Sequence, residues 1–226
     1  MDVARIATLL APYLAPQELT NPQLEEVGIY IDLLVRWNAK MNLTSVRDPD
    51  QIVQRHFGES FFLATRVLGD DATLLRAVDI GSGAGFPGLP VKIFRPEVTL
   101  TLVEAQYRKA IFLREVARAL KMTGVEVLSC RAEELADRSA GSADVVTLRA
   151  VERFADTLPV AARFVRDAKT SADHGRLALL IGADQASRAA TALPTFKWEK
   201  PLPLPGSDHR ILLVGRPGDS YRGQSK

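Results

Sequence analysis

The chain is poor in cysteine and in long apolar runs, and each shortage excludes a class of protein. Cys130 is the only cysteine among 226 residues, so no internal disulfide can form, which is typical of a reducing compartment. No stretch approaches the roughly 20 apolar residues of a membrane span, and Pro12 interrupts the short apolar start, unlike a signal peptide. His56, His174 and His209 lack metal-ligand spacing. We therefore expect a cytoplasmic protein without a metal site or a membrane segment.

The net charge of +2 is small, but the charges are unevenly distributed. Residues 1–70 carry six basic and nine acidic side chains, whereas residues 92–121 carry seven basic and three acidic ones. This local positive excess lies beside a glycine-rich segment and favours an anionic partner there. With 46% hydrophobic and 25% charged residues, the composition is otherwise that of a globular protein with a sizeable core.

The rest of the chain is organised around residues 74–90 (LLRAVDIGSGAGFPGLP). The apolar run over 74–80 predicts a buried parallel strand. Gly81, Gly83, Gly85 and Gly88 then predict a tight turn that leads into a helix. Glycine admits positive φ angles and lets a ligand approach without meeting a Cβ atom. The segment therefore predicts a site for a nucleotide-like ligand.

Two kinds of ligand fit this glycine pattern. Residues 83–88 satisfy the dinucleotide pattern G-x-G-x-x-G, and Glu104 follows about twenty residues on, where a ribose-binding acid is expected. However, Asp79 precedes the first glycine by two residues, and a carboxylate at the mouth of the loop would repel a pyrophosphate. It would attract the sulfonium and ammonium groups of S-adenosylmethionine, so we favour this methyl donor. A dinucleotide-dependent oxidoreductase and a non-catalytic nucleotide sensor remain alternatives.

Hydrophobic periodicity divides the chain into residues 1–70, 71–217 and 218–226. The first part predicts a helical cap, with Asn21 as the N-cap of one helix, a second helix that begins at Asp48-Pro49, and a polar, non-helical segment over 36–47. The second part alternates strands and helices, which predicts an α/β domain with a mostly parallel seven-stranded sheet and helices on both faces. The third part is expected to be a flexible tail. The expected strands lie near 75–80, 99–104, 125–129, 143–149, 176–181, 196–200 and 210–215, and the expected helices near 88–94, 106–121, 154–166 and 184–192.

Several candidate site residues fall at the carboxyl ends of expected strands, where ligands bind in such sheets. They are Asp79, Glu104, the segment 130–133 and Arg149. Glu104 is expected to bind the two ribose hydroxyls. Arg149 stands where amino-methylating enzymes usually carry Asn/Asp-Pro-Pro-aromatic, a motif absent from this sequence. Because arginine cannot accept a proton, its position favours an acceptor atom that needs no deprotonation, such as a ring nitrogen with an in-plane lone pair.

The expected helix 106–121 carries a stripe of basic residues. Arg108 and Lys109 lie in its first turn, where the helix dipole disfavours cations, and three more basic residues follow at helical spacing. Local stability does not explain this arrangement, and both a solvated face and a bound phosphate backbone remain open. His56 lies on the apolar stripe of an earlier helix and is expected to be a hydrogen-bonded core histidine.

Six motifs, in this order, resemble one known family. They are residues 36–49 (RWNAKMNLTSVRDP), 55–57 (RHF), 79–90 (DIGSGAGFPGLP), 95–96 (RP), 131–134 (RAEE) and 148–150 (LRA). Together they resemble the bacterial 16S ribosomal RNA guanine-N7 methyltransferase family (RsmG or GidB) over about residues 24–215. The FPGLP end of the glycine loop and the upstream WN and NLT residues distinguish this match from other class I methyltransferases.

The resemblance implies a Rossmann-like class I fold with an N-terminal helical extension. It implies S-adenosylmethionine as cofactor, S-adenosylhomocysteine as product, and methyl transfer to N7 of guanine 527 in 16S ribosomal RNA or the small ribosomal subunit. A small-molecule methyltransferase on the same fold is the alternative. By motif, it implies that Gly81 and Phe86 line the methionine end of the donor, that Ala132 and Glu133 approach the adenine, and that Arg149 both binds the donor and borders the methyl-transfer site.

The resemblance also implies which residues meet RNA. Arg108 and Lys109 match the family's basic pair after the second strand, and Asn42 and His56 fall in its N-terminal hallmark segment. No obligate protein partner is expected. The chain departs from the family at Ile181, where lysine is common, and in a longer loop over residues 166–175. Loss of that cation is expected to weaken or redirect RNA contacts without changing donor binding.

Overall fold

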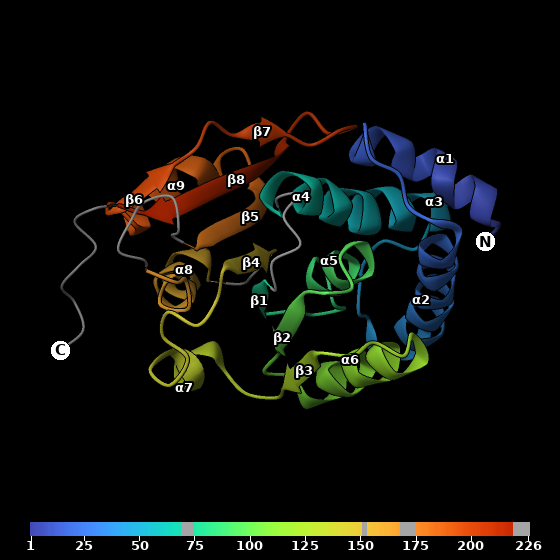
Figure 1. The fold of residues 1–226 in the computed structure, drawn as a ribbon, viewed down its shortest axis with the longest axis horizontal. Helices are drawn as coiled ribbons and strands as arrows, with labels where there is room; N and C mark the ends of the chain where they lie inside the picture. Colours follow the sequence, from blue (N-terminus) through green and yellow to red (C-terminus); the bar gives the residue numbers. More distant parts are fainter. Residues whose placement is uncertain (69–74, 151–152, 168–174, 219–226) are drawn as a thin grey trace.

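The fold is built on one mixed sheet (Figure 1). The computed structural model describes residues 1–68, 75–150, 153–167 and 175–218. In these ranges the strands are β1 (Arg76–Ile80), β2 (Thr99–Val103), β3 (Val125–Leu128), β4 (Val145–Arg149), β5 (Arg176–Gly182), β6 (Phe196–Trp198), β7 (Leu202–Pro203) and β8 (Arg210–Pro217). Their order is β3-β2-β1-β4-β5-β8-β6, with β7 paired to β8. Strands β1 to β5 are parallel, and β8 runs antiparallel to β5, β6 and β7.

The mostly parallel sheet is thus confirmed, with one strand more than the seven expected. The extra strand, β7, has two residues and ends in Pro203, so no alternating apolar pattern announces it. The helical elements are α1 (Val3–Leu14), α2 (Asn21–Met41), α3 (Pro49–Ile52), the π-helical turn η1 (Val53–Gly58), α4 (Glu59–Val67), α5 (Gly88–Phe94), α6 (Tyr107–Ala119), α7 (Ala132–Ala136), α8 (Phe154–Ala162) and α9 (Gln185–Ala192).

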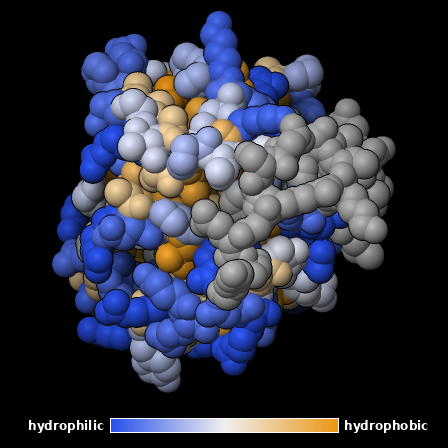
Figure 2. Space-filling view, turned by 90° about the vertical axis from the view of Figure 1, so that its left-hand side faces the viewer, coloured by the Kyte–Doolittle hydropathy of each residue, from blue (hydrophilic) through white to orange (hydrophobic). Residues whose placement is uncertain are grey.

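Helices cover both faces of the sheet, as expected (Figure 1). Side chains from α1 to α6 and one face of the sheet form two hydrophobic clusters, and those from α7 to α9 and the other face form a third. Alternation along β1 assigns Ala77 to the first face and Val78 and Ile80 to the second. Hydrophilic residues make up most of the surface in Figure 2, with hydrophobic ones gathered near its middle. Among the described residues, no helix is both long and apolar enough to cross a membrane.

The start and end of α2 differ from the sequence prediction. Its N-cap is Thr20, one residue earlier than expected, because Thr20 and Gln23 form a reciprocal capping box. The helix also continues to Met41, into the segment expected to be non-helical, and ends at Asn42 with a φ of 50°. Packing of buried α2 side chains against the core outweighs the low helix propensity of Asn38. By contrast, α3 begins as expected, with Asp48 accepting a hydrogen bond from the Gln51 amide.

The N-terminal helices share their core with the sheet. One hydrophobic cluster contains Tyr30 and Phe57 from the N-terminal part together with Phe86 and Phe112 from beyond it. Tyr30 stacks on Phe86, with ring centroids 5.2 Å apart. Residues 69–74, where the expected boundary falls, lie outside the described residues, and so do His174, most of the 166–175 loop and residues 219–226. The division into a cap, a domain and a tail therefore stays a prediction.

Candidate functional site

A cavity of about 810 Å³ opens at the carboxyl ends of the parallel strands. Its wall includes the glycine loop over residues 81–84, Glu104 after β2, the segment 130–133 after β3 and Arg149 at the end of β4. The structure therefore brings together most of the residues that the sequence placed at strand ends. The volume is that of a small-molecule site. Among the described residues, no group of histidine, cysteine and acidic side chains is arranged to hold a metal ion.

Glu104 is held rigidly beside the glycine loop. One of its carboxylate oxygens accepts a hydrogen bond from the Gly83 amide (2.8 Å), and the other accepts one from the Gln106 amide (2.7 Å). The side chain is buried but lines the cavity. These bonds fix the carboxylate relative to both β1 and the start of α6, and each oxygen keeps a second lone pair for a ligand hydroxyl.

Asp79 lies beneath the glycine loop and is not part of the cavity wall. It is 1% exposed, and its carboxylate accepts hydrogen bonds from the Thr147 hydroxyl (2.6 Å) and the Gly88 amide (3.3 Å). Strand alternation explains this, because Asp79 shares the face of Ala77, which α5 covers. Burial raises the pKa of Asp79 to about 6. The expectation of a carboxylate at the mouth of the loop is corrected to one that braces the loop from below.

Gly85 is needed for packing and does not line the cavity. Its φ is +91°, and a Cβ atom there would lie 2.3 Å from the Tyr30 hydroxyl and 2.5 Å from Leu89. The Tyr30 hydroxyl donates a hydrogen bond to the Ala84 carbonyl, so the ring occupies the space beside this glycine. The predicted role of Gly85 in ligand binding is therefore indirect. Gly83, with a φ of +59° and no atom nearer to its Cβ position than the Gly81 carbonyl oxygen at 3.8 Å, does line the cavity, as do Gly81 and Phe86.

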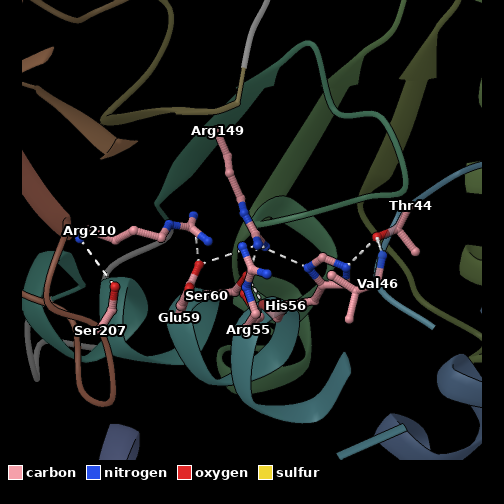
Figure 3. Close-up of polar contacts among 9 residues, drawn as sticks. All are labelled: Thr44, Val46, Arg55, His56, Glu59, Ser60, Arg149, Ser207 and Arg210. Atoms are coloured by element: carbon pink, nitrogen blue, oxygen red, sulfur yellow. Dashed lines mark hydrogen bonds and ion pairs between the residues drawn. The ribbon is translucent and has the colours of Figure 1, made fainter. Parts of the chain in front are cut away.

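Arg149 and His56 form a hydrogen-bonded wall of the cavity (Figure 3). One terminal nitrogen of Arg149, Nη2, donates to the Arg55 carbonyl (2.7 Å) and contacts His56 Nδ1 at 2.9 Å. Because arginine has no acceptor, His56 Nδ1 must accept, and the ring proton of neutral His56 is on Nε2. Nε2 then donates to the Thr44 hydroxyl oxygen at 2.7 Å. The His56 ring also stacks on Phe86, so the expected core histidine is at the same time a wall residue.

Glu59 and Arg210 complete this wall and were not identified from the sequence. The Glu59 carboxylate is 3.3 Å from Arg149 Nη2 and 2.8 Å from Arg210 Nη2, with its side chain 4% exposed. Burial lowers the pKa of Arg149 to about 10, which leaves it charged at neutral pH. Arg210 pairs with Gly182 across β5 and β8, next to Ile181. A neighbouring strand therefore places a cation beside the position where the family's lysine is missing. The sequence does contain a signal for Glu59, namely an acidic residue within the mostly apolar segment that follows His56.

The pKa of His56 makes a testable contribution to stability. Burial and the neighbouring Arg149 lower it from 6.5 to about 3. As the pH falls through about 6.5, the unfolded chain takes up a proton at His56 but the folded chain does not, so this contribution to stability is lost below that pH. Between pH 6 and pH 5, the wild type is expected to lose about 1 kcal/mol of unfolding free energy relative to His56→Gln in urea titrations. This comparison also cancels the opposite effect of Asp79.

His209, which is exposed, offers a matched control for this pH experiment. The His209→Gln variant is expected to keep the wild-type pH dependence of unfolding. A His56→Gln variant that lost stability in parallel with the wild type over this pH range would contradict the buried neutral histidine.

The candidate RNA residues are not all brought to the cavity. Lys109 lies at its rim, whereas Arg108 is exposed on the first turn of α6 outside it. Asn42 ends α2, is exposed, and accepts a long hydrogen bond from Arg47 (3.5 Å). Ala132 and Glu133 line the cavity beside Cys130. Of the four RNA candidates, His56 and Lys109 line the cavity, whereas Asn42 and Arg108 do not.

Comparison with known proteins decides the family. Residues 23–173 match the family described as GidB, rRNA small subunit methyltransferase G. The chain belongs to this family. Proteins named ribosomal RNA small subunit methyltransferase G from Syntrophotalea carbinolica and Roseiflexus sp. (strain RS-1) are 31% and 38% identical to it over 208 and 205 residues. The alignments cover 88% and 87% of this chain, and 91% and 84% of those proteins.

Solved structures agree on the fold of this GidB family member. A predicted O-methyltransferase from Agrobacterium tumefaciens superposes with a TM-score of 0.56 at 21% identity, covering 72% of this chain and 82% of that one. A precorrin-6y C5,15-methyltransferase from Geobacter metallireducens gives 0.53 at 14% identity, covering 70% and 86%. The predictions of the GidB family and of a Rossmann-like methyltransferase fold are thus confirmed.

Proposed function

We propose that this GidB family member transfers the methyl group of S-adenosylmethionine to N7 of guanine 527 in 16S ribosomal RNA. The observation that carries the proposal is the pairing, in one cavity, of Glu104 beside the glycine loop with Arg149 at the end of β4. The Glu104 carboxylate suits the hydroxyls of a ribose. Arg149 is a hydrogen-bond donor at a position where methylation of an amine calls for an acceptor. Relatives named as rRNA small subunit methyltransferases support RNA as the substrate.

The cavity fits S-adenosylmethionine. Gly83 leaves open space beside the fixed carboxylate of Glu104, which would bind the ribose hydroxyls. Ala132, a small wall residue, and Glu133 would approach the adenine, while Gly81 and Phe86 would face the methionine end. When bound, this cofactor supplies an electrophilic methyl group on a positively charged sulfur. The buried Asp79, whose pKa of about 6 leaves it mostly ionised at neutral pH, would add negative potential from beneath the loop.

The chain's own contribution to the reaction is orientation. Guanine N7 carries an in-plane lone pair, so no side chain has to remove a proton before methyl transfer. Holding the base and the methyl donor in line can supply much of the reduction in the barrier. The stacked rings of Phe86 and His56 line the cavity, and the buried Tyr30 ring stacks behind Phe86, so this side of the cavity is rigid enough to keep such an arrangement. In an unpaired RNA loop, the N7 atom of a guanine is accessible to the protein.

The first turn of α6 supports an RNA-binding surface next to the cavity. Arg108 is exposed, Lys109 reaches the cavity rim, and the preceding Tyr107 is 67% exposed. Basic side chains of this kind contact phosphates and position RNA without reading its sequence. An exposed tyrosine among them offers a face on which an unpaired base can stack. Together they would deliver RNA to the mouth of the cavity.

Mapping of methylated nucleotides tests the proposed function. The purified protein and labelled S-adenosylmethionine are incubated with 16S RNA, or with small subunits, from a strain that lacks the enzyme. Mass spectrometry is expected to find one 7-methylguanosine, at position 527. Methylation of another atom or nucleotide would overturn the proposal. Intact cofactor binding with no methylated RNA would favour the small-molecule methyltransferase.

In the same assay, reversing the charges of Arg108 and Lys109 to glutamate is expected to lower RNA methylation about 100-fold at moderate salt. Loss of phosphate contacts weakens RNA binding and reduces its salt dependence. Affinity for S-adenosylhomocysteine, measured by calorimetry, should stay within about twofold of the wild type because the cofactor contacts are retained. Lys197→Glu with Lys200→Glu, at the opposite edge of the sheet, changes the net charge equally and should retain activity. An equal loss in this control would remove the assigned surface.

A further inference from the structure

Thr147 connects β4 to the glycine loop through Asp79. Thr147 lies opposite Asp79 in the pairing of β4 with β1. The Thr147 hydroxyl donates a hydrogen bond of 2.6 Å to Oδ1 of Asp79, and the Gly88 amide donates one of 3.3 Å to Oδ2. Thr147 and Asp79 are 2% and 1% exposed, so both bonds are shielded from water. One buried carboxylate thus joins the strand that ends in Arg149 to the helix that follows the glycine loop.

The hydrogen-bond donors around Asp79 suit an ionised carboxylate. A backbone amide can only donate, so Oδ2, which faces the Gly88 amide, is a poor place for a proton. A proton on Oδ1 would have to be accepted by the Thr147 oxygen, and the Thr147 hydroxyl would then no longer donate to the carboxylate. Hydrogen bonds to ionised groups are roughly twice as strong as those between neutral groups. Thr147 therefore stabilises the ionised form of Asp79 over the protonated one.

The charged and titratable groups around Asp79 do not settle its ionisation by themselves. Glu104 after β2 disfavours it, and Arg149 favours it but forms its ion pair with another carboxylate. The buried hydroxyl of Tyr30 on α2 is neutral, and the Lys92 ammonium on α5 is held by two backbone carbonyls after that helix. Burial raises the pKa of Asp79 to about 6. Loss of one donor would therefore be enough to leave it largely protonated at neutral pH.

The proposed cofactor gives this buried charge a use. S-adenosylmethionine brings a sulfonium and an ammonium group into a cavity whose wall already carries the cation Arg149 at the end of β4. An ionised Asp79 beneath the loop offsets that repulsion, and its attraction is strong because little water lies between. Stability does not account for the arrangement, since burying a carboxylate without an ion pair opposes folding.

We propose that Thr147 is a positioning residue that sets the affinity for S-adenosylmethionine by keeping Asp79 ionised beneath the glycine loop; this rests on the proposed function, in which that compound is the cofactor. Thr147 is not part of the cavity wall, so it acts through Asp79. Without its hydroxyl, the affinity for the cofactor should depend on pH in the neutral range, where the affinity of the wild type is nearly constant.

Carbon-13 NMR of the aspartate carboxyl groups, in the protein without cofactor, tests the effect on Asp79. Its signal, identified by its loss in Asp79→Asn, is expected to titrate near pH 6 in the wild type. In Thr147→Val the midpoint should rise by about 1–2 pH units, because the ionised form loses a donor. Thr147→Ser keeps the donor and should titrate within about 0.5 pH units of the wild type. An unchanged midpoint in Thr147→Val would overturn the inference.

Calorimetric titration with S-adenosylmethionine, without RNA, tests the effect on the cofactor. At pH 7, Thr147→Val should bind about 3- to 10-fold more weakly than the wild type, and at pH 8.5 within about twofold of it, because Asp79 is ionised again. Thr147→Ser should bind like the wild type at both pH values. Thr101→Val is the matched control, since it removes a hydroxyl from β2 on the opposite face of the sheet, and it should leave the affinity unchanged.

Two results of this titration would count against the account in different ways. A loss of affinity in Thr147→Val that is the same at pH 7 and pH 8.5 would indicate a damaged loop instead of a missing charge, and would overturn the inference. A wild-type protein that binds no S-adenosylmethionine at either pH would instead refute the proposed function.

Discussion

Replacing Gly85 with alanine is expected to lower the free energy of unfolding by about 3–5 kcal/mol. The new Cβ would lie 2.3 Å from the Tyr30 hydroxyl, 2.5 Å from Leu89 and 3.1 Å from Leu113, all within the core. Tyr30 cannot move away without breaking its hydrogen bond to Ala84 and its stack on Phe86. The φ of +91° adds backbone strain. Urea denaturation followed by circular dichroism measures the effect.

Gly141 provides the matched control for this substitution. Its φ is also positive, at +62°, but no atom lies within 4 Å of the place where a Cβ would stand. The Gly141→Ala variant should therefore lose only about 1–2 kcal/mol, from the backbone alone. The difference between the two variants isolates the steric term against Tyr30. Equal losses would show that the packing beside the glycine loop does not limit this position.

Replacing Glu59 with glutamine is expected to destabilise the protein by about 3–5 kcal/mol. The neutral amide would leave the buried charge of Arg149 and the partly buried charge of Arg210 without a counter-ion. Methyl transfer should also fall, because Arg149 would no longer be held in place. Denaturation measures the first effect, and single-turnover methylation of RNA measures the second.

An exposed ion pair controls for the loss of one negative charge. Glu199→Gln breaks a contact with Arg216 at 3.3 Å, where both side chains are partly exposed, and should cost at most about 1 kcal/mol. Adding Arg210→Met to Glu59→Gln removes one of the uncompensated cations and should recover part of the stability. A double variant less stable than Glu59→Gln alone would contradict this electrostatic account.

Local patterns were sufficient to predict the layers of the fold. The alternation of short apolar runs with helical segments predicted the parallel strands β1 to β5 within a few residues. Because these strands are parallel, their carboxyl ends lie at the same edge of the sheet. Glu104, the segment 130–133 and Arg149 therefore lie together in the cavity. The prediction that residues 36–41 are not helical was wrong because the packing of α2 outweighed the low helix propensity of Asn38.

The sequence by itself determined the family, the fold class and the strand ends at which the cavity lies, because these depend on motifs and on periodicities of two and 3.6 residues. Only the tertiary structure decided which way each side chain faces and what it meets. Asp79 lies beneath the loop because β1 turns it towards α5. Glu59 and Arg210, far apart in the chain, meet as an ion pair. Such pairings depend on distances in space, and spacing along the chain does not contain them.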